Sequence, residues 1–325
     1  AKIIGDLDAA LTGSGLPKVV KSAELGRFTR AAAQMLRANV VMYQQDASRY
    51  ATVLTDMREI IGSGLYSLRS DFAGLWTDSG EWGTESIFEI NYTDSPSSRT
   101  WENPTKAGGT VFPTLIGING YSGPEWDTGG YGFEPVEEAL YNAYEGDDTR
   151  RDATILNFAK YRQQHPEATY TPRYDDTGYF NRKYLGRADG HDKYTGNAPE
   201  MNFRNNYRVW RYAETLLIAS ELIVRTNGDR DEADDYLNQV RARAFGMKPG
   251  DTAFAAKRRT ATLDNLLLEN RLEFALEGHR FWDLVRYGKA EEVLGSRGYT
   301  DAKKHLPIPQ SEIDQAHGTL KQNPY

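Results

Sequence analysis

The sequence has no cysteine among its 325 residues. Structural disulfides, thiolate metal ligands and cysteine nucleophiles are therefore excluded. It also has no apolar run near the ~20 residues that a membrane-spanning helix requires. Only five histidines are present, and they form neither a His-Glu-x-x-His motif nor another zinc-binding pair. From these absences we expect no metal site and no cofactor.

Positive charge is also in short supply. The formal net charge is -7 and the sequence pI is near 5.4, so we expect no nucleic-acid partner, because phosphate binding needs a basic face. Aromatic residues are abundant by contrast, with 20 Tyr, 12 Phe and 6 Trp. Many of these rings must lie at or near the surface, where flat exposed rings are typical of binding surfaces.

Residues 2–62 carry apolar side chains at helical spacing, with a break at residues 12–17. The later part predicts two antiparallel helices joined near residues 44–50, a hairpin of the tetratricopeptide type. Small side chains at positions 31–33 would let the two helices approach closely. Residues 1–6 have no signal-peptide form. They resemble the middle of a helix, so we expect an upstream segment to be missing.

Residues 63–204 differ in kind, because they hold four of the six Trp and most of the Gly and Pro. The segment 86–92 alternates apolar and polar residues, which predicts a strand. A short helix is expected at 135–144. Irregular regions of this length are either functional or disordered. The high aromatic content argues against disorder, so we expect this region to be functional.

Residues 205–290 return to helical spacing. One helix is expected to include Val209 and to end near Gly228, and a second spans about 233–244. A third is predicted from Thr262 to about Gly278. The two tryptophans with apolar neighbours in this part, Trp210 and Trp282, are interpreted as core residues.

The predicted fold is mainly α: a tetratricopeptide-like scaffold of helical hairpins (an α/α superhelix) with a long, loop-rich insertion carrying short strands. Residues 1–62 are the first scaffold part, and residues 63–204 are the irregular, aromatic-rich ligand-binding region. Residues 205–325 are the carboxy-terminal helices and a Pro-rich clasp around Pro307 and Pro309, which pack on the same scaffold.

Several sequence blocks, taken in order, resemble one known family. The strongest is the segment 269–286, Glu-Asn-Arg-Leu-Glu-Phe-Ala-Leu-Glu-Gly-His-Arg-Phe-Trp-Asp-Leu-Val-Arg. The supporting blocks are 26–33, 87–90, 207–217, 306–313 (Leu-Pro-Ile-Pro-Gln-Ser-Glu-Ile) and 320–325. Together these blocks closely resemble the SusD/RagB family over nearly the whole chain.

The resemblance implies a non-catalytic lipoprotein on the extracellular face of the bacterial outer membrane. Members of this family capture nutrient, usually oligosaccharide and in the RagB branch peptide. They deliver it to a partner, a SusC-type TonB-dependent transporter. Members also carry a signal peptide, a lipidated cysteine and further amino-terminal helices, none of which is present in this sequence. The lipid anchor and some ligand contacts are therefore expected outside these residues.

Three glutamates, Glu269, Glu273 and Glu277, are spaced by four and would share one helical stripe. We expect them to join a partly buried network with arginines. Arg271, Arg280 and Arg286 are close in sequence, and Arg208 and Arg211 could reach across from the earlier helix. The alternative is a catalytic carboxylate pair of a glycoside hydrolase. Arginines would lower the pKa values of these acids, which is wrong for a general acid, so the structural interpretation is preferred.

Five rings in polar, Gly-rich surroundings are the candidate ligand-binding residues. They are Trp82, Trp101, Tyr121, Trp126 and Tyr131. A sugar ring stacks its C–H face on an aromatic ring while polar side chains bind its hydroxyls. The same rings could instead anchor the loops or face the transporter. Two acidic stretches, 145–152 and 189–192, lack the spacing of a calcium-binding loop and are interpreted as solvated turns.

The predicted function is cell-surface binding of an oligosaccharide and its delivery to the transporter, without catalysis. The alternatives are a peptide-binding member of the same family and a glycoside hydrolase. An intracellular helical scaffold that binds a protein partner is a further alternative. Stacking rings alone do not distinguish these ligands.

Overall fold

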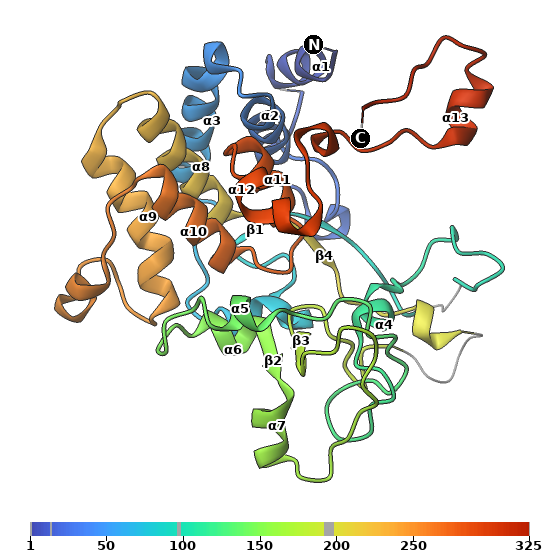
Figure 1. Cartoon of the computed structure of the whole chain (residues 1–325). Coiled ribbons are helices and arrows are strands. Elements are labelled where there is room, and N and C mark those ends of the chain that lie inside the picture. Colours follow the sequence, from blue (N-terminus) through green and yellow to red (C-terminus); the bar gives the residue numbers. More distant parts are fainter. Residues whose placement is uncertain (1, 14, 96–98, 192–197, 325) are drawn as a thin grey trace.

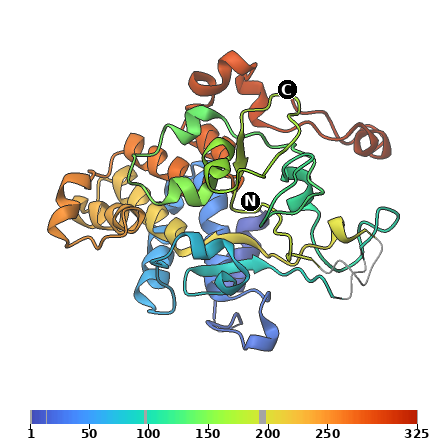
Figure 2. The same cartoon turned by 90° about the horizontal axis from the view of Figure 1, so that it is seen from below.

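The structure is a computed structural model that describes residues 2–13, 15–95, 99–191 and 198–324. Asp192 of the second acidic stretch and Tyr325 of the last family block lie outside the described residues. Helices gather on one side of the molecule and irregular segments on the other (Figures 1 and 2). None of the helices in these ranges is long and apolar enough to cross a membrane.

The amino-terminal helices lie in the predicted segments, although the second begins at Arg30 and leaves out Leu25 and Phe28, which the apolar spacing had included. They are α1 (Lys2–Leu11), α2 (Arg30–Gln44) and α3 (Tyr50–Gly62). The Thr29 side chain accepts a hydrogen bond from the backbone N–H of Ala32 (3.2 Å) and caps α2. Helix α2 ends at Gln44, and the left-handed φ of 53° at the capping residue Gln45 turns the chain toward α3. The predicted helical hairpin is thus confirmed.

The second helical part follows a strand that the sequence reasoning missed. Its elements are β4 (Tyr207–Arg211), α8 (Tyr212–Arg225), α9 (Arg230–Ala244), α10 (Leu263–Glu273), α11 (Arg280–Arg286), α12 (Ala290–Leu294) and α13 (Gln310–Gln315). The prediction that Val209 is helical is wrong. β4 pairs antiparallel with β1 (Ser86–Ile90), which the sequence did predict as a strand.

Both helical parts share one core. α2 packs on α3, α3 on α8, and α8 on α9 and α10. The buried side chains at their contacts include Met35, Val53, Met57, Leu216, Leu217, Leu237 and Leu266. Because this core draws on residues far apart in sequence, the antiparallel helices form one continuous scaffold.

Between β1 and β4, the helices and strands of the described residues are short. They are α4 (Phe112–Ile116), α5 (Glu138–Tyr141), α6 (Arg150–Thr154), β2 (Ile155–Asn157), α7 (Phe158–Gln164) and β3 (Tyr179–Asn181), with β2 and β3 paired antiparallel. Aromatic residues pack together beneath these loops, including Phe158, Tyr161 and Phe180. The described part of the region thus has a small aromatic core of its own.

The tail beyond α12 projects from the rest of the molecule in both views (Figures 1 and 2). It closes on itself, because Gln322 Nε2 donates to the carbonyl of Ile308 (2.9 Å) and Asn323 Nδ2 donates to that of Leu306 (2.8 Å). The Pro-rich strip is thus held by the carboxy-terminal residues of the tail itself, and it is exposed: Leu306 is 59% accessible.

Candidate binding surface

Tyr121 and Trp126 are buried, at 3% and 1% exposure. The Tyr121 hydroxyl donates to the carbonyl of Pro124 (2.5 Å) and lies 3.1 Å from the Tyr161 hydroxyl. The guanidinium of Arg187 lies 5.2 Å from the centre of the Trp126 ring. These two side chains therefore anchor the loops, and in this conformation neither presents a ring face to a ligand.

Trp82 lies beside β1 and is half-buried. Its backbone φ is +49°, a conformation that bulky residues rarely adopt. Two hydrogen bonds hold it there: the backbone N–H donates to Glu89 Oε1 (2.9 Å) and the indole Nε1 donates to Asn91 Oδ1 (2.7 Å). Its ring meets Phe88 edge-on at 6.3 Å, and the half-exposed Phe28 packs on Phe88 at 4.7 Å. Trp82 thus belongs to a ring cluster at the edge of the scaffold.

Trp101 and Tyr131 belong to two segments that are both tied to α4. The Trp101 ring is 49% exposed, and its Nε1 donates to Glu200 Oε1 (2.8 Å). Thr114 of α4 donates through its hydroxyl to the carbonyl of Glu200 (2.6 Å). The carbonyl of Thr114 accepts from the backbone N–H of Tyr131 (2.8 Å). One residue of α4 therefore positions both segments.

Phe133 adds a ring that the sequence reasoning missed. It is 59% exposed, and its centre lies 5.6 Å from that of Tyr131. Arg173 covers it from another loop, with its guanidinium 5.1 Å from the ring centre, and donates to the carbonyl of Tyr131 (2.5 Å). The signal was the one used for Tyr131, because Phe133 is also an aromatic residue next to glycine. We call the surface formed by Trp101, Tyr131, Phe133, Arg173 and Glu200 the aromatic loop face.

Close backbone packing fixes the loops behind this face. A Cβ atom at Gly130 would lie 2.2 Å from the carbonyl carbon of Gly117, so neither chain could move aside without breaking the loop crossing. The backbone N–H of Gly132 also donates to the carbonyl of Gly117 (2.7 Å). The Tyr131 and Phe133 rings are therefore presented by a backbone held in place before any ligand binds.

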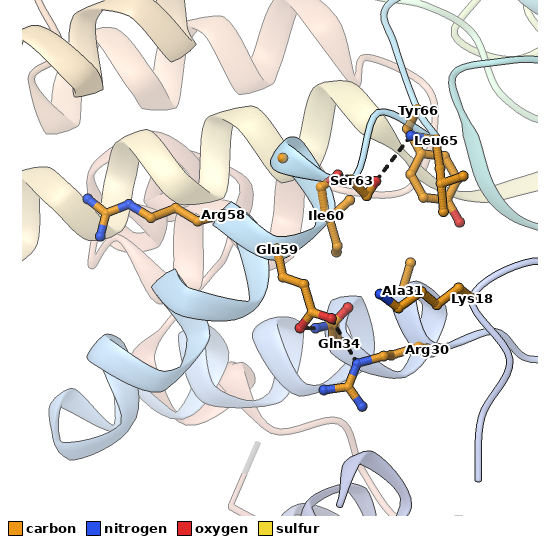
Figure 3. A pocket seen from close by; sticks show the side chains of 11 residues that line it. Lys18, Arg30, Ala31, Gln34, Arg58, Glu59, Ile60, Ser63, Leu65 and Tyr66 are labelled. Atoms are coloured by element: carbon orange, nitrogen blue, oxygen red, sulfur yellow. Dashed lines mark hydrogen bonds and ion pairs between the residues drawn. The ribbon is translucent and has the colours of Figure 1, made fainter. Parts of the chain in front are cut away.

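A separate hollow between α2 and α3 is lined largely by polar side chains (Figure 3). Arg30 and Gln34 converge on Glu59, with Arg30 Nε 3.0 Å from Oε1 and Gln34 Nε2 2.7 Å from Oε2. Burial alone would raise the pKa of Glu59, but the hydrogen bonds from Arg30 and Gln34 lower it. Because these groups pair with one another, the hollow is a weaker candidate for ligand binding than the aromatic loop face.

The glutamates of the family signature form a buried ion network. Arg211 Nη1 lies 2.6 Å from Glu85 and 2.9 Å from Glu273, and its Nη2 lies 2.8 Å from Glu277. Arg150 Nη1 lies 2.7 Å from Glu269. The predicted network is thus confirmed. Cations that the sequence reasoning did not assign to it also take part: Arg150, Lys183, Arg241 and Arg243.

Two details of that prediction were wrong. Helix α10 ends at Glu273, so Glu277 lies beyond the helix and shares no stripe with Glu269. Left-handed residues at Leu276 (φ 66°) and Gly278 (φ 85°) turn the chain there. Arg208 does not join the network, since it sits three residues from Arg211 on a strand and points to the other face. Its Nη2 donates to the carbonyl of Thr77 (3.1 Å).

The network is unsuited to acid catalysis. Burial by itself would raise the pKa of Glu273, but the guanidiniums of Arg243 and Arg211 outweigh it and hold that pKa well below its ordinary range. Arg211 and Lys183 likewise lower the pKa of Glu277 against the effect of burial. Acids held ionised in this way do not protonate a leaving group near neutral pH.

The acidic stretch at 145–152 is not a set of solvated turns, contrary to the prediction. Glu145 binds Arg241, Lys257 (2.9 Å) and Arg259 (3.1 Å). Asp148 is 4% exposed and binds Arg150 at 2.8 Å. Among the described residues, no group of three or more acidic or histidine side chains is arranged to hold a metal ion.

Glu145 gives an expected pH dependence of stability. Burial would raise its pKa, but hydrogen bonds from Lys257 and Arg241 lower it to about 2, from an ordinary value of 4.5. Between these values the unfolded chain binds more protons. The stability from ionised Glu145 is therefore fully present above about pH 4.5 and is lost as the pH falls toward 2.

Urea unfolding of the wild type and of Glu145→Gln across this range tests the effect. We expect the two unfolding free energies to differ at neutral pH and to converge toward pH 2. Asp235→Asn is the matched control, because that carboxylate is largely exposed and lies 3.6 Å from Arg258. A difference for Glu145→Gln that stays constant with pH would contradict the assignment.

Comparison with known proteins gives consistent matches. A model of the SusD family matches residues 84–325. Surface glycan-binding protein A from Bacteroides thetaiotaomicron, solved in complex with laminarihexaose, is 42% identical over 100% of this chain and 70% of its own, with a TM-score of 0.89. A laminarin-binding SusD-like protein is 32% identical over 99% of this chain and 67% of its own, with a TM-score of 0.85. The predicted fold class, a mainly helical scaffold with short strands, is the fold of these structures.

Curated relatives match at lower identity. SusD-like protein P25 of Formosa agariphila is 25% identical over 96% of this chain and 61% of its own length. SusD-like protein P2 of the same organism is 27% identical over 79% of this chain and 52% of its own length. The chain therefore spans between about half and three fifths of the length of these relatives.

Proposed function

The chain belongs to the SusD family of non-catalytic binding proteins, and on this basis we propose that it binds glycan at the cell surface through the aromatic loop face. The observation that carries the proposal is the grouping of Trp101, Tyr131 and Phe133 around α4, beside Arg173 and Glu200. These rings offer apolar faces to a sugar, while the guanidinium and the carboxylate can bind its hydroxyls.

The ligand we propose is a laminarin-type glucan. Its support is indirect: two similar structures, at 42% and 32% identity, are described as a laminarihexaose complex and as a laminarin-binding protein. The segments that carry these rings are held by Thr114 and by the close backbone contact of Gly130 with Gly117. The surface therefore loses little conformational freedom when a glucan binds.

The remaining assignments rest on the family resemblance. We propose that the protein acts on the extracellular face of the outer membrane and passes its ligand to a SusC-type TonB-dependent transporter. Residues 63–204 are proposed as the ligand-binding region, and residues 1–62 and 205–325 as the scaffold that carries it. Trp82 remains a proposed ligand contact at the margin of that region, through the part of its ring that is exposed.

Isothermal titration calorimetry with laminarihexaose, cellohexaose, maltohexaose and a mixture of short peptides tests the proposal. We expect saturable heat with laminarihexaose and little or none with the others. Binding of peptides in place of every glycan would overturn the glycan assignment in favour of the peptide-binding alternative. Release of shorter sugars during incubation with laminarihexaose would overturn the non-catalytic assignment.

A further inference from the structure

A second large hollow lies on the scaffold, between α2 and α11, which are side by side (Figure 1). Its volume is about 620 Å³. The rings that line it include Tyr43 of α2, Tyr207 and Trp210 of β4, and Trp282 of α11. Trp210 is buried as predicted, but Trp282 is 40% exposed, which corrects its interpretation as a core residue. We call this hollow the α2–α11 groove.

The rings of the groove face an open space. The Trp282 ring contacts Tyr43 edge-on, with centres 5.7 Å apart, and the Phe281 ring edge-on at 5.0 Å. A tryptophan that meets other rings only through edges leaves a large apolar area uncovered. Val40 and Val209 add further apolar lining. Exposed apolar surface of this kind on a stable scaffold is typical of an interaction site.

A buried carboxylate lies among the groove-lining residues. Glu214 of α8 is 6% exposed, and its Oε1 accepts from the Asn39 amide (3.2 Å) when that amide also accepts from Trp210 Nε1 (3.0 Å). Its Oε2 has no hydrogen-bond partner within the described chain. A buried carboxylate oxygen left unpaired is costly. Burial also raises the pKa of Glu214, and a cation bound beside it would oppose that shift.

The pairing of the charged groups in the lining leaves one carboxylate oxygen without a partner. Glu277, Asp283 and His279 line the groove together with Glu214, and Glu277 is bound to Arg211 and Lys183. The guanidinium of Arg286, which also lines it, is bound to Glu221 at 2.6 Å and to Asp283 at 2.9 Å. The other two acids of the lining are therefore paired with cations, and the oxygen that lacks a partner is Glu214 Oε2. An incoming donor with positive charge would complement it.

The apolar surface continues beyond the groove. Tyr43 also lines the neighbouring hollow that contains Lys304 and His305, and His305 lines the next one, with Leu306 and Phe281. The Tyr43 hydroxyl donates to the carbonyl of Lys304 (3.2 Å), so the groove and the projecting tail are joined. This extended path is longer and more apolar than a sugar ring with its rim of hydroxyls requires, and it suits a polypeptide.

We infer that the α2–α11 groove docks a polypeptide segment in which apolar side chains flank a lysine or arginine. The apolar side chains cover Trp282, Tyr43 and Val40, and the basic side chain reaches Glu214 Oε2. The groove shares no residue with the aromatic loop face, so this inference can be tested independently of glycan binding.

Selection of short random peptides displayed on phage against the chain, with counter-selection against Trp282→Ala, tests the inference. We expect enriched peptides to carry Lys or Arg between apolar residues. A synthetic copy of the best one should lose at least about tenfold in affinity with Glu214→Gln and with Trp282→Ala. Trp101→Ala, which alters only the aromatic loop face, is the control and should bind this peptide as the wild type does.

Several results would overturn the inference. One is enrichment of peptides without a basic residue; another is a failure to enrich any peptide that depends on Trp282. Laminarihexaose binding that is lost in Trp282→Ala would instead make the groove a glycan site. A dimer that is present in the wild type and absent in Trp282→Ala would make a second copy the occupant. Urea unfolding checks that both variants fold. If Glu214→Gln does not fold, Trp282→Ala still tests the inference, because Trp282 is half-exposed and its removal should leave the fold intact.

Discussion

Replacing Arg211 by Met is expected to lower the free energy of unfolding by about 3–5 kcal/mol, the largest stability change we predict. Arg211 is 2% exposed and binds carboxylates on three segments, those of Glu85, Glu273 and Glu277. Methionine fills a similar volume without charge, so these acids would keep their burial and lose a shared cation. Equilibrium unfolding in urea measures the change.

Two further variants sharpen this test. Arg211→Lys keeps the positive charge but lacks the planar fork that reaches several acids at once, so we expect an intermediate loss. Arg58→Met removes an arginine of a partly exposed pair, Arg58 with Glu232, and should cost less than about 1 kcal/mol. If Arg211→Met were as stable as Arg58→Met, the buried network would not be what holds these segments together.

Loss of the rings on the aromatic loop face is expected to have the largest effect on binding. For Trp101→Ala combined with Phe133→Ala, we expect affinity for laminarihexaose to fall at least tenfold, or about 1.4 kcal/mol. Both rings are about half exposed or more, so their removal should leave the fold intact. Calorimetry measures the affinity and urea unfolding checks stability.

The matched control for this pair is Trp282→Ala, which removes a comparably exposed ring from the scaffold. It should bind laminarihexaose as the wild type does. Undiminished binding by the Trp101 and Phe133 double variant would show that the ligand lies elsewhere on the chain. That outcome would leave the family membership untouched, because the membership does not depend on these rings.

The scaffold could be predicted because its signals are local. Helices α2 and α3 follow from apolar spacing within single segments, and both lie where that spacing put them. Strand β4 was missed because Tyr207–Arg211 fits a helical pattern as well as an alternating one. Its pairing with β1, more than a hundred residues earlier, decides between them. The local sequence pattern of a short segment does not show whether a distant strand will pair with it.

The binding surface was harder to predict for a related reason. Trp101 and Trp126 occur in similar polar, Gly-rich sequence, yet one ring is 49% exposed and the other 1%. Burial of Trp126 depends on other loops that fold over it, including those of Arg182 and Arg187. The composition indicates that such rings either anchor loops or contact ligand. Which of the two applies depends on how the loops pack against one another in three dimensions.

The β1–β4 pair brings the two ends of the long irregular region together, since Ile90 is paired with Tyr207. A segment whose ends lie side by side could be replaced by another without changing the helical scaffold. Under the proposed function, such replacement would be a route to a different ligand preference. The exchange has one constraint. Arg150 and Lys183 lie inside that segment, while Glu269, Glu273 and Glu277 lie outside it. A replacement without these two cations leaves the acids with Arg211, Arg241 and Arg243 alone, so such a chimera should be less stable whatever its loops bind.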